Sequence, residues 1–123
     1  MIDTDTLKKN YEFKNVLSKG KFFSGDYINI YIRQNHRRKN YIGIAVGVKI
    51  AKATKRNRLK RLIRENYRLL ESNIKKGNDI VFLWKKSKKV EDANFNYIKM
   101  DMIKIFTKAN LLKEDDIERW KNF

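Results

Sequence analysis

The sequence predicts one α/β domain, built as a two-layer sandwich of helices packed on a sheet. Apolar residues recur at every second position in 27–33 and 41–48, which is typical of strands. They recur at every third or fourth position in 52–68 and 91–112, which is typical of helices. With 41% hydrophobic residues, a chain of 123 residues can bury a core without disulfides. We therefore expect a single domain over residues 1–123.

The first expected element is a short helix over residues 7–19. Tyr11 or Phe13 lies at helical spacing from Val16, and Gly20 stands where a C-cap glycine belongs. From residue 21 the spacing of apolar residues changes from a helical to a strand-like period.

Strands are expected from residue 21 onward. Residues 27–33 alternate strictly, with the isoleucines inward and Tyr27 and Tyr31 on the opposite face, and Phe22-Phe23 is a candidate short strand before them. In 41–48, one face carries branched residues and the other carries only Gly43, Ala45 and Gly47. A face of small residues leaves room for something to lie against it.

A long basic helix follows, starting near Ala53–Arg56 and ending before Gly77. Residues 80–84 form a continuous apolar run, which suits a strand buried on both faces, and the strand–helix–strand order suggests that it pairs in parallel with 41–48. A second long helix is expected at 91–112 and a short terminal helix at 114–120.

The charge pattern predicts a polyanionic partner. The formal net charge is +16, and no Asp or Glu occurs between Tyr27 and Arg64. On the basic helix, leucines and Ile63 gather on one side and cations on the other, with Glu65 as the one interruption. Such a row of like charges repels itself unless an anion neutralises it. We expect phosphate binding by the polar residues of this segment, which are Lys49, Lys52, Lys55, Arg56, Asn57, Arg58, Lys60, Arg61, Arg64 and Arg68.

Aromatic residues indicate the kind of polyanion. Taken singly, Phe13, Tyr27 and Tyr31 are more often core residues. Beside cations, however, exposed aromatics form stacking platforms for unpaired bases. Together with the small-residue face they predict a groove for single-stranded nucleic acid.

Catalytic and membrane functions find little support. There is no cysteine, and His36, the single histidine, has no acidic neighbour to orient it. Asp115 and Asp116 could be imagined as a metal pair, but adjacent acids at a helix start are usually caps. No run approaches the length of a membrane helix, and the start does not resemble a secretory signal. We expect a cytoplasmic protein with no metal site of its own.

Residues 55–65 resemble the signature of the protein subunit of bacterial ribonuclease P, Arg-Asn-Arg-x-Lys-Arg-x-x-Arg. The resemblance extends to the opening helix, to the strand before the signature and to Asp79-Ile80-Val81. Residues 113–123 have no counterpart and form a possible C-terminal extension. Before the signature, Gly47-Val48-Lys49 and Ala51-Lys52 stand where many members have Ser-Lys-Lys and Gly-Asn.

The resemblance implies an α-β-β-β-α-β-α order with a ribosomal-protein-like fold, and a left-handed strand–helix–strand crossover, opposite to the general rule. It also implies a ribonucleoprotein endonuclease that removes the 5′ leader from precursor tRNA. Catalysis and Mg²⁺ then belong to the RNA subunit, and this chain is the non-catalytic subunit, with no further protein partner required. By similarity, the signature residues face the RNA subunit, whereas Phe13 and Tyr31 line the cleft for the leader, and Leu17 stands where some members carry another aromatic residue.

Two other functions remain open at the level of the sequence. A general or ribosomal-type RNA-binding protein would have the same charge without preferring leader-bearing tRNA. A protein-only nuclease would cleave without RNA, and the scarcity of acids and histidines in the basic segments disfavours it.

Overall fold

The computed structural model describes residues 3–113. Five strands form one mixed sheet in the order β1-β4-β5-β3-β2. The strands are β1 (Thr4–Thr6), β2 (Lys21–Ser24), β3 (Ile28–Gln34), β4 (Asn40–Ala45) and β5 (Asn78–Trp84). The helices are α1 (Asn10–Lys19), α2 (Ala53–Leu70) and α3 (Phe95–Lys108), with short 3-10 turns at Glu71–Asn73 and Val90–Asp92. The mixed α+β class is confirmed.

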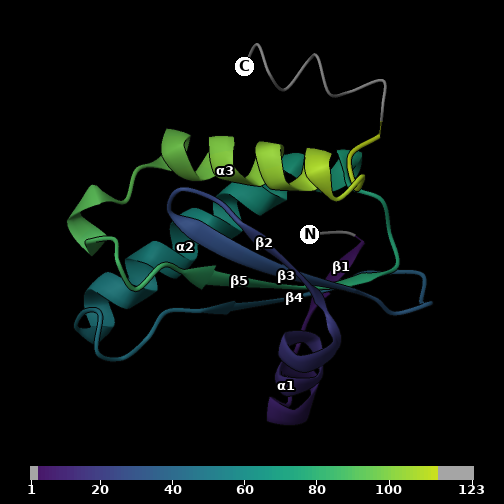
Figure 1. The fold of residues 1–123 in the computed structure, drawn as a ribbon, viewed down its shortest axis with the longest axis horizontal. Helices are drawn as coiled ribbons and strands as arrows, with labels where there is room; N and C mark the ends of the chain where they lie inside the picture. Colours follow the sequence, from purple (N-terminus) through teal and green to yellow (C-terminus); the bar gives the residue numbers. More distant parts are fainter. Residues whose placement is uncertain (1–2, 114–123) are drawn as a thin grey trace.

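The main core lies between the sheet and the pair α2 and α3, which cover the same face of it (Figure 1). Alternation places Ile28, Ile30 and Ile32 of β3 in this core, as the sequence predicted. From β5, Phe82 packs edge-on against both Tyr67 of α2 and the ring of Phe106 on α3, and this aromatic chain joins the two helices to the sheet.

Helix α1 lies alone against the other face of the sheet (Figure 1). Val16 and Leu7 pack there on Val81 of β5. The small-residue face of β4 receives α1, because a Cβ atom added to Gly43 would overlap the ring of Phe13. What lies against Gly43 is therefore a side chain of this same protein.

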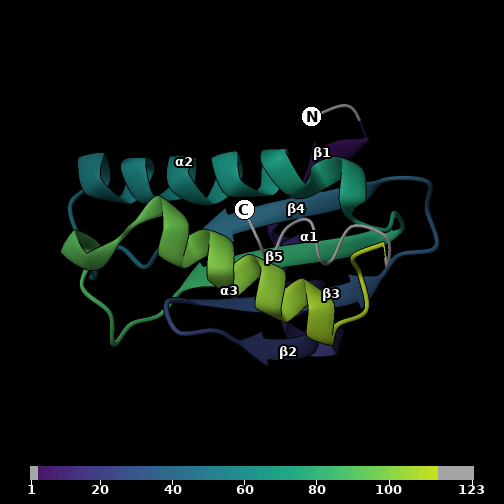
Figure 2. The same cartoon turned by 90° about the horizontal axis from the view of Figure 1, so that it is seen from above.

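Strands β4 and β5 pair in parallel, as expected, and α2 connects them along the chain. In Figure 2 the helices lie in front of the sheet, and β4 and β5 both run towards the left. The chain leaves β4, passes through α2 in front of the sheet and enters β5, which lies below β4 in this view. This crossover is left-handed, as the resemblance implied and against the usual preference.

Some boundaries differ from the expectation. Strand β1 was not expected, and it pairs in parallel with β4 at the sheet edge. Helix α3 starts only at Phe95, because the Asn94 side chain caps it by accepting hydrogen bonds from the backbone N–H groups of Asn96 and Tyr97 at 2.8 and 3.3 Å. The expected terminal helix at 114–120 falls outside the described residues.

Candidate nucleic-acid interface

Helix α2 separates its apolar and basic residues as its period predicted. Leu59, Ile63 and Leu70 are buried against the sheet and α3, and Tyr67 is buried with them. Leu69 was expected on the apolar side but is exposed. The basic residues of the segment are exposed except for Arg56 and Lys60, which are half-buried.

Three of the predicted cations have partners inside the protein. Arg56 donates from Nη1 to the carbonyl oxygens of Ala51 at 2.8 Å and Val48 at 3.4 Å, and so it braces the loop before α2. Lys55 pairs with Glu91 at 3.0 Å, and Arg68 pairs with Glu65 at 2.9 Å. The pKa of Glu91 is lowered, first by a backbone hydrogen bond and then by Lys55.

The other predicted phosphate-binding residues on α2 form what we term the cation face, comprising Asn57, Arg58, Lys60, Arg61 and Arg64. Within residues 3–113, none of the four cations has an ion pair. The first turn of the helix also lacks an acidic residue, so its N–H groups add to the positive potential. An external anion fits this surface better than any group of the described chain.

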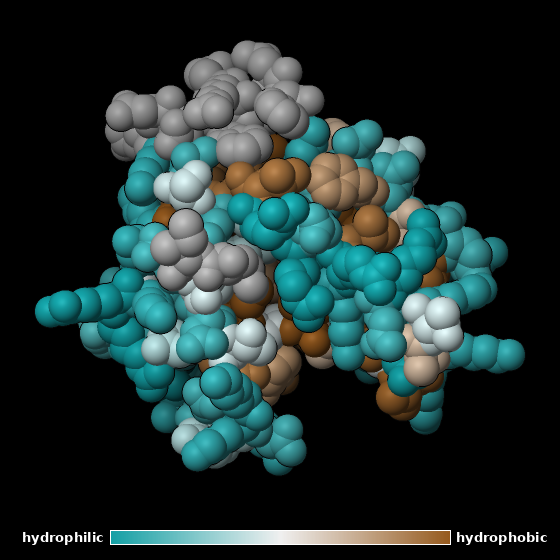
Figure 3. All heavy atoms as spheres, turned by 180° about the vertical axis from the view of Figure 1, so that it is seen from behind, coloured by the Kyte–Doolittle hydropathy of each residue, from teal (hydrophilic) through white to brown (hydrophobic). Residues whose placement is uncertain are grey.

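On the opposite side of the sheet, apolar and aromatic side chains gather beside α1. This aromatic face comprises Phe13, Leu17, Phe22 and Tyr31. The rings of Phe22 and Tyr31 are 5.0 Å apart, and Phe22 is 49% exposed and Leu17 38% exposed. Figure 3 views the molecule from the opposite edge, that of β1 and β4, and shows apolar surface in a recess beside the lobe formed by α1. The structure thus brings Phe13 and Tyr31 into one cluster, and Leu17 lies one helical turn after Phe13 on α1.

Tyr27 does not join them, and the prediction that it shares a face with Tyr31 is wrong. Tyr27 precedes β3 and its ring stacks on Tyr97 of α3, at 5.2 Å and 8°, with Trp84 6.0 Å away. It therefore packs on the side of the main core. Burial is the first cause that raises its pKa, followed by neighbouring Tyr97 and nearby acids.

The structure adds a basic hollow that sequence reasoning missed. It lies at the carboxyl ends of β4 and β5, has a volume of about 1270 Å³ and is lined by Lys49 and by four further lysines. In the wall of this strand-end hollow, Val48, Lys49 and Ile50 belong to the loop before α2, and Leu83 belongs to the same apolar cluster as Phe13 and Tyr31. The signal in the sequence was the run Lys85, Lys86, Lys88 and Lys89 directly after a buried strand.

His36 is exposed at a backbone φ of 58°, in the loop between β3 and β4. In the described part of the chain, no three His, Cys, Asp or Glu side chains lie close enough to hold a metal ion. No helix there is long and apolar enough to cross a membrane.

Comparison with known proteins places this geometry in context. The family model described as Ribonuclease P matches residues 1–110. The ribonuclease P protein component of Clostridioides difficile is 42% identical over 115 residues, 93% of this chain and 94% of that protein. Its counterpart from a Thermoanaerobacter species is 39% identical over 105 residues, 85% of this chain and 89% of that protein.

Solved structures agree with the sequence comparison. The RNase P protein of Thermotoga maritima superposes with a TM-score of 0.75 at 30% identity, covering 84% of this chain and 96% of that one. The Staphylococcus aureus RNase P protein gives 0.76 at 26% identity, covering 88% and 97%.

Proposed function

Because the chain belongs to the ribonuclease P protein family, we propose that it is the RNA-binding subunit of a ribonuclease P that removes the 5′ leader from precursor tRNA. The observation that carries the proposal is the cation face, four cations on one side of α2 without an acidic partner in the described chain. Catalysis in this proposal belongs to the RNA subunit, and the protein positions the two RNAs.

The RNA subunit is assigned to the cation face. When Arg58, Lys60, Arg61 and Arg64 neutralise phosphates there, the counterions condensed on the RNA are released, so that affinity falls steeply with salt. Asn57 adds an amide that can donate to phosphate or base edges. Mg²⁺ does not fit this surface, because hard divalent cations take carboxylate and carbonyl oxygens, and we assign it to the RNA subunit and the substrate.

The leader is assigned to the aromatic face and the strand-end hollow. A single strand that crosses the hollow meets lysines for its phosphates and then reaches Phe22 and Tyr31, on which unpaired bases can stack. In this proposal, a substrate cleaved next to the cation face extends its leader across the hollow towards α1.

Reconstitution tests the proposal. The chain is mixed with a bacterial ribonuclease P RNA at low Mg²⁺, and cleavage of precursor tRNA is followed. We expect the protein to accelerate cleavage and to lower the concentration of precursor needed, with a smaller effect on binding of mature tRNA. The absence of stimulation at any protein concentration would refute the proposal. Equal affinity for precursor and mature tRNA in the complex would instead favour a general RNA-binding protein.

A further inference from the structure

A second basic hollow lies at the other end of the sheet. It has a volume of about 650 Å³ and is formed where the start of β2, the end of β3, the start of β5 and the end of α3 meet. Phe23, Ile32 and Leu111 contribute apolar wall, and the cations around it are Lys21, Lys75, Lys76 and Lys108. We term it the β2–α3 hollow.

The four lysines come from three separate parts of the chain and are all exposed. Lys76 pairs with Asp3 at 3.3 Å, and the ammonium group of Lys21 lies 5.6 Å from the centre of the Phe23 ring. Lys75 and Lys108 have no acidic partner among residues 3–113. Convergent like charges around a concave surface raise the local potential, and this potential concentrates anions.

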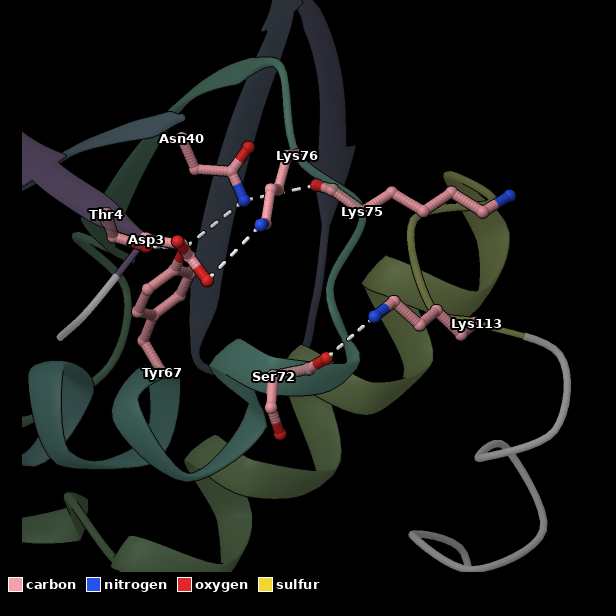
Figure 4. A network of polar contacts seen from close by, with 8 residues as sticks. All are labelled: Asp3, Thr4, Asn40, Tyr67, Ser72, Lys75, Lys76 and Lys113. Atoms are coloured by element: carbon pink, nitrogen blue, oxygen red, sulfur yellow. Dashed lines mark hydrogen bonds and ion pairs between the residues drawn. The ribbon is translucent and has the colours of Figure 1, made fainter. Parts of the chain in front are cut away.

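The backbone that carries Lys75 and Lys76 is held rigidly (Figure 4). The buried Asn40 side chain donates to the carbonyl oxygen of Lys75 at 3.1 Å and accepts from the N–H of Asn78 at 2.9 Å. The N–H of Lys75 donates to the carbonyl oxygen of Leu111 at 2.7 Å. In Figure 4 the Lys75 side chain extends away from this network. Hydrogen bonds therefore hold the Lys75 backbone in place, while its ammonium group can still contact an anion from outside the protein.

This hollow is distinct from the surfaces assigned above. Strand β5 runs from one to the other, because Asn78 lines the β2–α3 hollow and Trp84 lines the strand-end hollow. Six residue steps separate them by about 20 Å. Figure 2 shows the start of α2 and the end of α3 at opposite ends of the molecule, over opposite edges of the sheet.

We propose that the β2–α3 hollow is a second RNA-binding surface that holds the phosphate backbone of a segment remote from the cation face. The inference rests on the proposed function for the identity of the anion as RNA. Amide groups of Gln34, Asn78 and Asn110 around the hollow add hydrogen-bond donors for phosphate and ribose oxygens. The segment belongs either to the RNA subunit or to the precursor tRNA, and the two sources share this chemistry.

The test compares two double variants of the full chain that remove the same charge. Lys75→Gln/Lys108→Gln neutralises the hollow, whereas Lys8→Gln/Lys104→Gln changes exposed lysines that do not line it. Binding to ribonuclease P RNA alone is measured over a range of salt, and then binding of precursor tRNA to the preformed complex. Circular dichroism checks that each variant is folded.

For the hollow variant we expect the slope of log affinity against log salt to flatten by about 1.5, equivalent to roughly a 30-fold loss at 0.1 M relative to 1 M salt. The control variant should change much less. A loss in the first arm assigns the hollow to the RNA subunit, and a loss confined to the second assigns it to the substrate. Equal slopes for both variants in both arms would overturn the inference, whereas a wild-type chain that binds neither RNA would overturn the proposed function.

Discussion

Gly43 offers a direct test of how α1 is seated on the sheet. In Gly43→Ala, the new Cβ would lie 2.5 Å from Cε2 and 3.1 Å from Cε1 of Phe13, well inside ordinary contact. The ring cannot sink into the strand, so it or the whole helix must move outward by about 1 Å. Overpacking of this kind costs about 1–3 kcal/mol, and loss of glycine's freedom in the unfolded chain offsets about 0.5–1 kcal/mol.

The free energy of unfolding should therefore fall by about 1–2 kcal/mol, which lowers Tm by about 4–8 °C for a domain of this size. Thermal unfolding of Gly43→Ala, Phe13→Leu and the double variant measures the coupling. The smaller leucine makes room for the methyl group, so the double variant should be more stable than additivity predicts, by about 1 kcal/mol. Additive effects, or a Gly43→Ala variant as stable as the wild type, would show that Gly43 does not seat Phe13.

Four further predictions concern binding and stability. Arg61→Ala should weaken binding to the RNA subunit and flatten its salt slope by about one, and an unchanged slope would place Arg61 outside the interface. Tyr31→Ala should weaken binding of leader-bearing tRNA in the complex but not of mature tRNA, whereas equal losses would make Tyr31 merely structural. Asp101 is 3% exposed and accepts hydrogen bonds from the N–H groups of three consecutive residues, 26–28, at 2.7–3.0 Å. Asp101→Asn should therefore lower the free energy of unfolding, measured by chemical denaturation, by about 2–4 kcal/mol. A loss under about 1 kcal/mol would contradict this account. Burial raises the pKa of Tyr67 above its ordinary value of 10.0, so its contribution to stability is complete below pH 10 and is lost as pH rises through the raised pKa. The free energy of unfolding should therefore fall less at alkaline pH in Tyr67→Phe than in the wild type. Identical pH profiles of the two proteins would contradict this prediction.

Local periodicity was enough to predict most of the sheet but not its edge or its hand. Strict alternation identified β3, and the long apolar run identified β5. Strand β1 is only Thr4-Asp5-Thr6, with no apolar alternation to detect, and it exists because its backbone pairs with β4. The left-handed crossover depends on how α2 packs back on the sheet, which no local pattern encodes. It could be expected only through resemblance to the family.

The site was predictable where one element determines it. Helical spacing alone separates the cation face from the apolar side of α2. The prediction for Tyr27 was wrong because side chains alternate between faces only inside a strand, and Tyr27 precedes β3. The position of Tyr27 is set instead by Asp101 of α3, whose carboxylate accepts hydrogen bonds from the N–H groups of residues 26–28. These bonds turn the chain towards α3 just before β3 starts. That contact spans more than 70 residues of sequence and leaves no local signal.

The cations of the basic segment are not equivalent, and this affects how their variants should be interpreted. Arg56 and Arg61 look alike in the sequence, yet Arg56 donates to two carbonyl oxygens of the loop before α2, whereas Arg61 is exposed without a partner in the described chain. Removing Arg56 leaves those carbonyl oxygens without a charged donor and loosens the wall of the strand-end hollow, where Val48 lies. Its loss would therefore lower RNA affinity partly through the loop, with a change in stability, whereas the loss at Arg61 should be purely electrostatic. Measuring affinity and stability together separates the two roles, because only the electrostatic one disappears as salt is raised.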